Sequence, residues 1–203
     1  MMIFPARHAA PIYNPGLRAL HWLMAALIFI ALPLGVWASL LPRGHVRSEI
    51  LFVHKSIGMT VLCLVALRIV WRVIVGAPDY AEPLGRLTHV AARSAHIALY
   101  ALMIAMPVSG YVLSTTGGFD IPWFGLFSFP ILLQKDHALH EVGTWAHFLF
   151  AWGIGFVLAA HLCAVIWHAA VRRDSVLTRM WPSYRHARLA GDRDSASVHP
   201  SRP

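Results

Sequence analysis

Four long apolar runs constrain this chain more than any other feature of its sequence. They span Leu17–Leu40, Leu51–Val75, Ser94–Leu113 and Val142–Val171. A helix rises 1.5 Å per residue, so each run is long enough to cross about 30 Å of hydrocarbon. With 58% hydrophobic and only 13% charged residues, the composition is far from that of a soluble domain. The sequence therefore predicts an all-α, integral membrane four-helix bundle. The first run is too long for a cleavable signal peptide, and we expect it to remain as a helix.

Positive charge is distributed unevenly between the segments that connect these runs. Of the 17 Lys and Arg residues, thirteen lie in the N-terminus, in or around the 76–93 loop, or in the C-terminal tail. The other four lie in or around the 41–50 and 114–141 segments. Cytoplasmic loops carry the excess of Lys and Arg, which predicts that both termini are cytoplasmic. The net charge is +8, and the Lys and Arg residues lie mostly at the edges of the apolar runs. We therefore expect them to contact the membrane surface and not nucleic acid.

Composition also divides the chain into two parts. Residues 1–182 hold the four runs and are predicted to form one transmembrane domain, whereas residues 183–203 have few large apolar side chains and are predicted to be a polar, disordered cytoplasmic tail. The 114–141 segment is rich in aromatic and turn-forming residues, and we expect it to lie against the membrane interface.

Histidine is the unusual residue within the apolar runs. The chain has 13 histidines, while its nine acidic residues all fall outside the runs or at their rims. Ionisable residues inside a membrane mark a functional site by default. A proton relay or metal centre built on carboxylates lacks its ligands here. Imidazoles paired across helices are instead a suitable ligand set for a six-coordinate haem iron.

Four of the histidines lie at matching depths. His21 is near the cytoplasmic start of the first helix, and His54 is near the outer start of the second. His147 and His161 are fourteen residues apart on the fourth helix, about 40° short of four full turns and about 21 Å apart along the axis. This pattern predicts two iron sites, the outer one at His54 and His147 and the inner one at His21 and His161.

Two other histidines are rivals for these positions. His168 lies seven residues after His161 on nearly the same face, and its depth slightly favours it as the partner of His21. His140 lies on the same stripe, seven residues before His147. The residue pattern leaves both rivals open. A non-redox membrane protein with structural histidines is a further alternative.

Three more residues are candidates for contact with a cofactor. Gly58 lies one helical turn from His54, where a missing side chain would let a porphyrin approach the backbone; close helix packing is the alternative. Arg68 and Arg72 lie at the inner end of the second helix and are candidates to pair with haem propionates. Alternatively, both arginines extend to the membrane surface and fix the topology.

Several motifs, taken in order and spacing, resemble the bacterial cytochrome b561 family, which are four-helix dihaem cytochromes b of the inner membrane. The resemblance covers about Tyr13 to Pro182. The motifs that show it include Leu20-His21-Trp22-Leu23, His54-Lys55-Ser56-Ile57-Gly58, Met106-Pro107-Val108-Ser109-Gly110-Tyr111, Ala160-His161-Leu162 and Leu177-Thr178-Arg179-Met180-Trp181-Pro182. It implies two haem b groups and iron ligands at His21, His54, His147 and His161, and so disfavours His168. One departure is that the His-Glu pair of the fourth helix stands at His140-Glu141, seven residues before His147.

The resemblance also implies a function. Members of the family exchange electrons with ubiquinone or another carrier, and some resemble a superoxide oxidase, so superoxide:ubiquinone oxidoreductase activity is one expectation for this chain. The alternative is a haem b subunit that relays electrons between quinone and a docked dehydrogenase or soluble cytochrome.

His96 is left without a partner once four ligands are assigned, and a buried imidazole needs a hydrogen bond. A quinone carbonyl near the inner site would supply one. A backbone carbonyl, a haem propionate or Tyr100 is the alternative.

Overall fold

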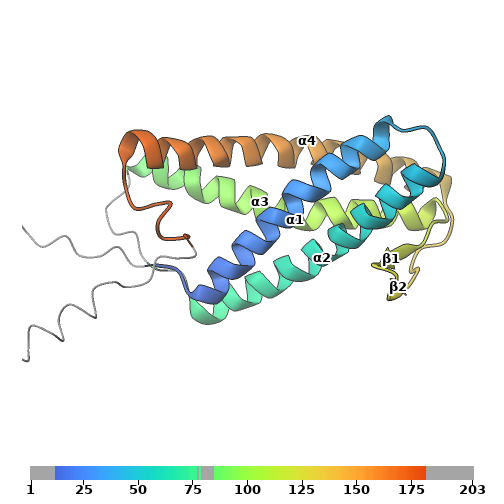
Figure 1. Cartoon of the computed structure of the whole chain (residues 1–203), viewed down its shortest axis with the longest axis horizontal. Coiled ribbons are helices and arrows are strands. Elements are labelled where there is room, and N and C mark those ends of the chain that lie inside the picture. Colours follow the sequence, from blue (N-terminus) through green and yellow to red (C-terminus); the bar gives the residue numbers. More distant parts are fainter. Residues whose placement is uncertain (1–11, 77, 79–84, 182–203) are drawn as a thin grey trace, which may run out of the picture.

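The computed structural model describes residues 12–76, 78 and 85–181, which form four long helices and one short β-hairpin (Figure 1). The elements are α1 (Pro15–Leu40), α2 (His45–Val75), α3 (Arg86–Thr116), β1 (Ile121–Trp123), β2 (Phe127–Phe129), α4 (His137–Trp167) and the π-helical turn η1 (His168–Arg172). All four α-helices are long and apolar enough to cross a membrane. The predicted four-helix architecture is confirmed. The predicted tail at 183–203 lies outside the described residues.

The helices extend beyond the apolar runs that predicted them. Helix α2 begins at His45 and not at Leu51, and α3 begins at Arg86 and not at Ser94. Hydropathy marks the part of a helix that lies in hydrocarbon, whereas the added turns carry polar residues that suit the interface. Helix α4 begins at His137 because the side chain of Asp136 caps it, accepting from Leu139 N at 2.9 Å.

The helices pack as two hairpins. Helix α1 lies along α2 and α3 lies along α4, and the two pairs join mainly where α2 meets α3. In Figure 1 the α1–α2 pair is inclined to the α3–α4 pair. Helices α1 and α4 have little close backbone packing with each other. Contact between α1 and α4 is therefore made mainly by side chains, such as the rings of His21 and His161.

Both described ends of the chain lie at one end of the bundle, where Tyr13 N donates to Arg179 O at 3.2 Å. We call this the inner end, following the orientation that the charges predict. The end with the 41–44 turn and the β-hairpin is the outer end.

The β-hairpin is docked on α2. Strands β1 and β2 are antiparallel, and a turn with positive φ at Phe124 and Gly125 joins them. The indole Nε1 of Trp123 donates to Thr60 Oγ1 at 3.0 Å, and Phe124 N donates to the hydroxyl of the fully buried Ser56 at 3.0 Å. The sequence predicted an interfacial segment here but no strands, because three-residue strands are too short to show an alternating pattern.

Large apolar side chains cover the outside of the bundle. On α4 the outward-facing residues include Trp145, Leu149, Trp152 and Phe156, and all four are exposed. Such a surface would aggregate in water but is suited to lipid.

Candidate functional site

The outer histidine pair joins α2 to α4. The ring centroids of His54 and His147 are 6.1 Å apart, with the ring planes at 86°. His54 Nδ1 lies 3.0 Å from Ala31 O, and His147 Nδ1 lies 3.0 Å from Met106 O. A carbonyl only accepts, so each Nδ1 carries the proton and donates. Each Nε2 is therefore left with a lone pair for a metal.

Two glycines from neighbouring helices make room for these rings. A Cβ added to Gly35 of α1 would lie 2.9 Å from Cε1 of His54, and one added to Gly110 of α3 would lie 2.9 Å from Cε1 of His147. Both distances are shorter than real Cβ contacts. The two outer rings therefore lie directly against the backbone of the adjacent helix. Sequence reasoning did not identify either glycine as a site residue, because each acts on a ring of another helix.

The inner histidine pair joins α1 to α4. The ring centroids of His21 and His161 are 6.5 Å apart, at 66°. His96 of α3 adds a third ring, whose centroid is 5.5 Å from that of His161. The indole of Trp22 packs edge-on against His21 at 5.6 Å.

Both pair separations match two imidazoles bound to one iron. A metal–imidazole bond is about 2.0 Å long and the ring centre lies about 1.1 Å beyond the nitrogen, which puts the two centroids about 6.2 Å apart. Among the described residues, no group of three or more His, Cys, Asp or Glu side chains is arranged for a bare metal ion. Two protein donors suffice when a porphyrin supplies the other four nitrogens, so the pairs fit haem.

Arg68 lies at the inner end of α2 and is buried, with 5% of its surface exposed. Its Nη1 donates to Leu17 O of α1, and its Nε donates to the hydroxyl of Tyr100 on α3 at 3.0 Å. The interpretation that Arg68 extends to the membrane surface is therefore wrong, because α1 and α3 supply acceptors inside the bundle. Arg72, one turn further, is half-buried.

Gly58 does not mediate close helix packing, which was the alternative interpretation. A Cβ added there would meet no atom within 4 Å among the described residues.

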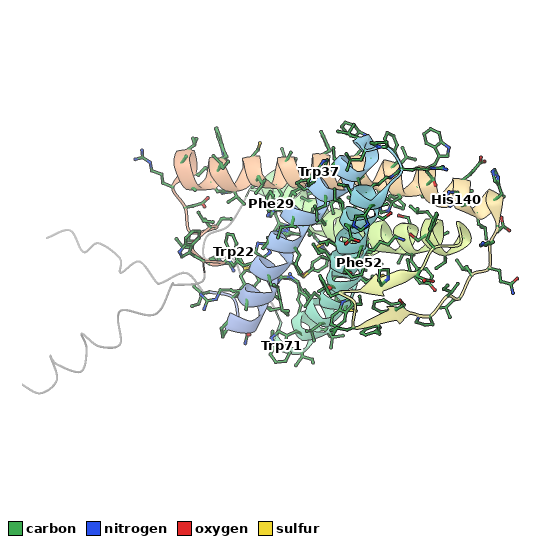
Figure 2. The ribbon with its side chains drawn as sticks, turned by 45° about the vertical axis from the view of Figure 1, so that its right-hand side comes forward. Trp22, Phe29, Trp37, Phe52, Trp71 and His140 are labelled. Atoms are coloured by element: carbon green, nitrogen blue, oxygen red, sulfur yellow. The ribbon has the colours of Figure 1, made fainter. Side chains whose placement is uncertain are left out.

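The rival histidines are bound elsewhere. His168 Nδ1 is 2.5 Å from Asp174 Oδ2, just beyond α4. His140, at the outer end of α4 (Figure 2), has its Nδ1 2.7 Å from Leu113 O. In the described part of the chain, neither ring contacts His21 or His54.

Membrane-length helices with histidines paired between them define the class of helical-bundle b-type cytochromes, which hold haem without covalent attachment. The chain belongs to the prokaryotic cytochrome b561 family, whose sequence profile matches residues 12–183. It is 33% identical over 166 residues to "Cytochrome b561 homolog 2" of Escherichia coli (strain K12), covering 80% of this chain and 87% of that protein. It is 28% identical over 170 residues to "Probable superoxide oxidase CybB" of Yersinia pestis, covering 82% and 93%. Membership implies haem b and membrane electron transfer in a multi-pass bacterial membrane protein.

Proposed function

We propose that this protein binds two haem b groups and carries electrons across the bacterial inner membrane between an outside donor and the quinone pool. The observation that carries the proposal is the presence of two interhelical histidine pairs at two depths of one bundle. The α4 members, His147 and His161, are separated by about 21 Å along the helix. Haem supplies reversible one-electron chemistry when it is bound.

At the outer site, His54 and His147 are the proposed axial ligands. The carbonyls of Ala31 and Met106 hold their Nδ1 protons and direct Nε2 away from the backbone. The hydroxyl of Ser109, 3.1 Å from His147 Nδ1, steadies the same ring. Gly58, whose surroundings would admit a Cβ, is the proposed place where the porphyrin approaches α2.

At the inner site, His21 and His161 are the proposed ligands, and Arg68 and Arg72 are proposed to pair with propionates. Arg68 supports this role because it is a buried cation whose identified partners, Leu17 O and Tyr100 OH, are uncharged. A buried cation is stabilised by an anion within hydrogen-bonding reach.

His96 is the proposed quinone contact. It lies on α3 beside the inner pair and retains exposed surface. One ring nitrogen bonds the backbone carbonyl of Ala92, so the other nitrogen of the neutral ring is available to accept from a hydroxyl of the reduced quinone.

Superoxide is the proposed outside donor. The outer end carries the cations Arg43, Arg47, Lys55 and Lys135, which attract a small anion. Lys55 is fixed there, because its Nζ donates to Asp120 O at 3.0 Å. The name of the Yersinia pestis relative points in the same direction.

Two measurements on the purified protein test the proposal. A pyridine haemochrome assay should give two haems per chain, and a value of one or none contradicts the dihaem arrangement. Mixing with superoxide and ubiquinone alone should give quinol. Absence of turnover, together with intact haem spectra, would instead favour a subunit that serves a docked dehydrogenase or soluble cytochrome.

A further inference from the structure

The chain that follows α4 turns back across the inner end of the bundle. Helix α4 ends in the π-helical turn η1, and Arg173 then takes a left-handed conformation, with φ of 53°. Residues 174–181 run from there toward the start of α1 (Figure 1). We call residues 173–181 the clasp. It contains most of the motif Leu177-Thr178-Arg179-Met180-Trp181-Pro182, to which the proposed function assigns no role.

The clasp is attached to α1 by backbone acceptors and an aromatic contact. Trp22 Nε1 donates to Met180 O at 2.7 Å, and Arg18 Nη1 donates to Trp181 O at 2.9 Å. The rings of Trp22 and Trp181 meet edge to face, with centroids 5.7 Å apart. Trp22 thus contacts both the clasp and the ring of His21.

The clasp is also attached at its beginning and in its middle. At the beginning, Asp174 binds the ring of His168 and accepts from Val176 N at 3.1 Å. In the middle, Arg179 is buried, with 4% of its surface exposed. Its Nη2 donates to Pro78 O at 2.9 Å, and its guanidinium lies 5.4 Å from the ring centroid of Tyr13. The clasp therefore links α4, the α2–α3 connection and the start of α1.

The inner histidine pair needs such a link more than the outer pair does. His54 and His147 bind backbone carbonyls and lie against glycines, whereas the structure shows no hydrogen bond from the described part of the chain to the rings of His21 and His161. These two rings belong to α1 and α4, which have little backbone packing with each other. The inner ends of α1 and α4 diverge in Figure 1. The clasp crosses between those two ends.

We propose that the clasp fixes the separation of α1 and α4 and so keeps His21 and His161 together within reach of one iron, with Trp22 and Arg179 as positioning residues. This inference rests on the proposed inner haem site. Weakening the clasp should let one of the two imidazoles leave the iron, which would then bind carbon monoxide when reduced.

The test uses the full chain with the variants Arg179→Met and Trp22→Leu. Arg179→Lys retains a cation that can donate to Pro78 O, and Trp22→Phe retains a ring that can pack against Trp181. Each of these variants should therefore disturb the inner site less than Arg179→Met or Trp22→Leu does. The matched controls are Arg43→Met at the outer end and Trp152→Leu on the lipid-facing side of α4. His21→Ala and His54→Ala identify the inner and outer components of the spectrum.

The first readout is the fraction of reduced haem that binds carbon monoxide. Loss of a hydrogen bond from a charged donor should raise this fraction for the inner component by about tenfold in Arg179→Met, with the outer component unchanged. The second readout is independent of haem. Spin labels at Ala19→Cys on α1 and Ala170→Cys on η1, in a background with Cys63 and Cys163 replaced by Ala, report the separation of α1 from the inner end of α4. Their distance distribution should broaden in Arg179→Met and in Trp22→Leu but in neither control.

An unchanged distance distribution and unchanged carbon monoxide binding in both clasp variants would overturn the inference, provided that His21→Ala removes the inner component. If His21→Ala itself leaves the spectrum intact, the proposed inner haem site is wrong and the positioning role is withdrawn with it. Broadened distance distributions in the clasp variants, together with increased carbon monoxide binding by the inner component alone, support the positioning role of the clasp.

Discussion

Replacing Gly35 by alanine should damage the proposed outer haem site and leave the proposed inner site intact. The added Cβ would lie 2.9 Å from Cε1 and 3.3 Å from Nδ1 of His54, and no backbone atom is involved in the overlap. Ordinary van der Waals contact begins near 3.4 Å. The His54 ring must therefore move by about half an ångström, which exceeds the tolerance of about 0.2 Å on a metal–ligand distance.

Two opposing energies decide the outcome. Alanine is a better helix former than glycine by about 0.5–1 kcal/mol, which would stabilise α1. Overpacking a filled site costs about 1–3 kcal/mol, and here the strain falls on the ring and on its bond to Ala31 O. The overpacking cost is larger, so we expect a net loss at the outer site without unfolding of the bundle.

Low-temperature absorption and electron paramagnetic resonance of purified variants would measure this effect. Gly35→Ala should alter or remove the low-spin signal that His54→Ala removes, and Gly110→Ala should do the same through His147. Gly85→Ala is the matched control, because a Cβ there meets no atom of the described residues within 4 Å. If Gly35→Ala keeps both signals unchanged, as Gly85→Ala should, the glycine does not position the ring.

Three other substitutions give further tests. His161→Ala should remove the inner haem alone. His168→Ala should keep both haems, because the His168 ring is bound to Asp174. The reverse pattern in haem content would mean that the α4 ligand is misassigned. His96→Leu should keep the haem spectrum and slow electron exchange with quinone, as followed by stopped-flow absorbance, and a wild-type rate would contradict the quinone role. Trp123→Phe removes the hydrogen bond to Thr60 and should destabilise the β-hairpin by about 1 kcal/mol. The melting temperature should fall while the haem spectra stay unchanged. An unchanged melting temperature would show that this bond does not hold the hairpin.

The features that sequence could predict are those encoded locally along one helix. Hydropathy located the four helices, and the fourteen-residue spacing of His147 and His161 put both rings on one face of α4. Their partners on α1 and α2 could be suggested from depth alone, and the structure brings His21 and His54 beside them. The ligand roles themselves stay predictions.

Other features depend on contacts between segments that are distant in the sequence, and a sequence pattern does not predict such contacts. Gly35 looks like any small residue of an apolar run, since its neighbour His54 is on another helix. Arg68 looks like a residue that extends to the membrane surface until the acceptors on α1 and α3 are seen. The contacts of the clasp could not be predicted from its side chains, because its own backbone carbonyls accept the hydrogen bonds from Trp22 and Arg18.

Both histidine pairs take one member from α4, and this bears on how the protein is made. A ribosome completes α1, α2 and α3 before α4, so the nascent chain at that stage carries His21, His54 and His96 without either partner of the two pairs. Neither pair exists until the last helix has entered the membrane. Under the proposed ligand assignment, haem binding by two protein ligands is therefore a late step of biogenesis. A chain truncated within α4 between His147 and His161 would complete the outer pair and leave the inner pair without its second ring.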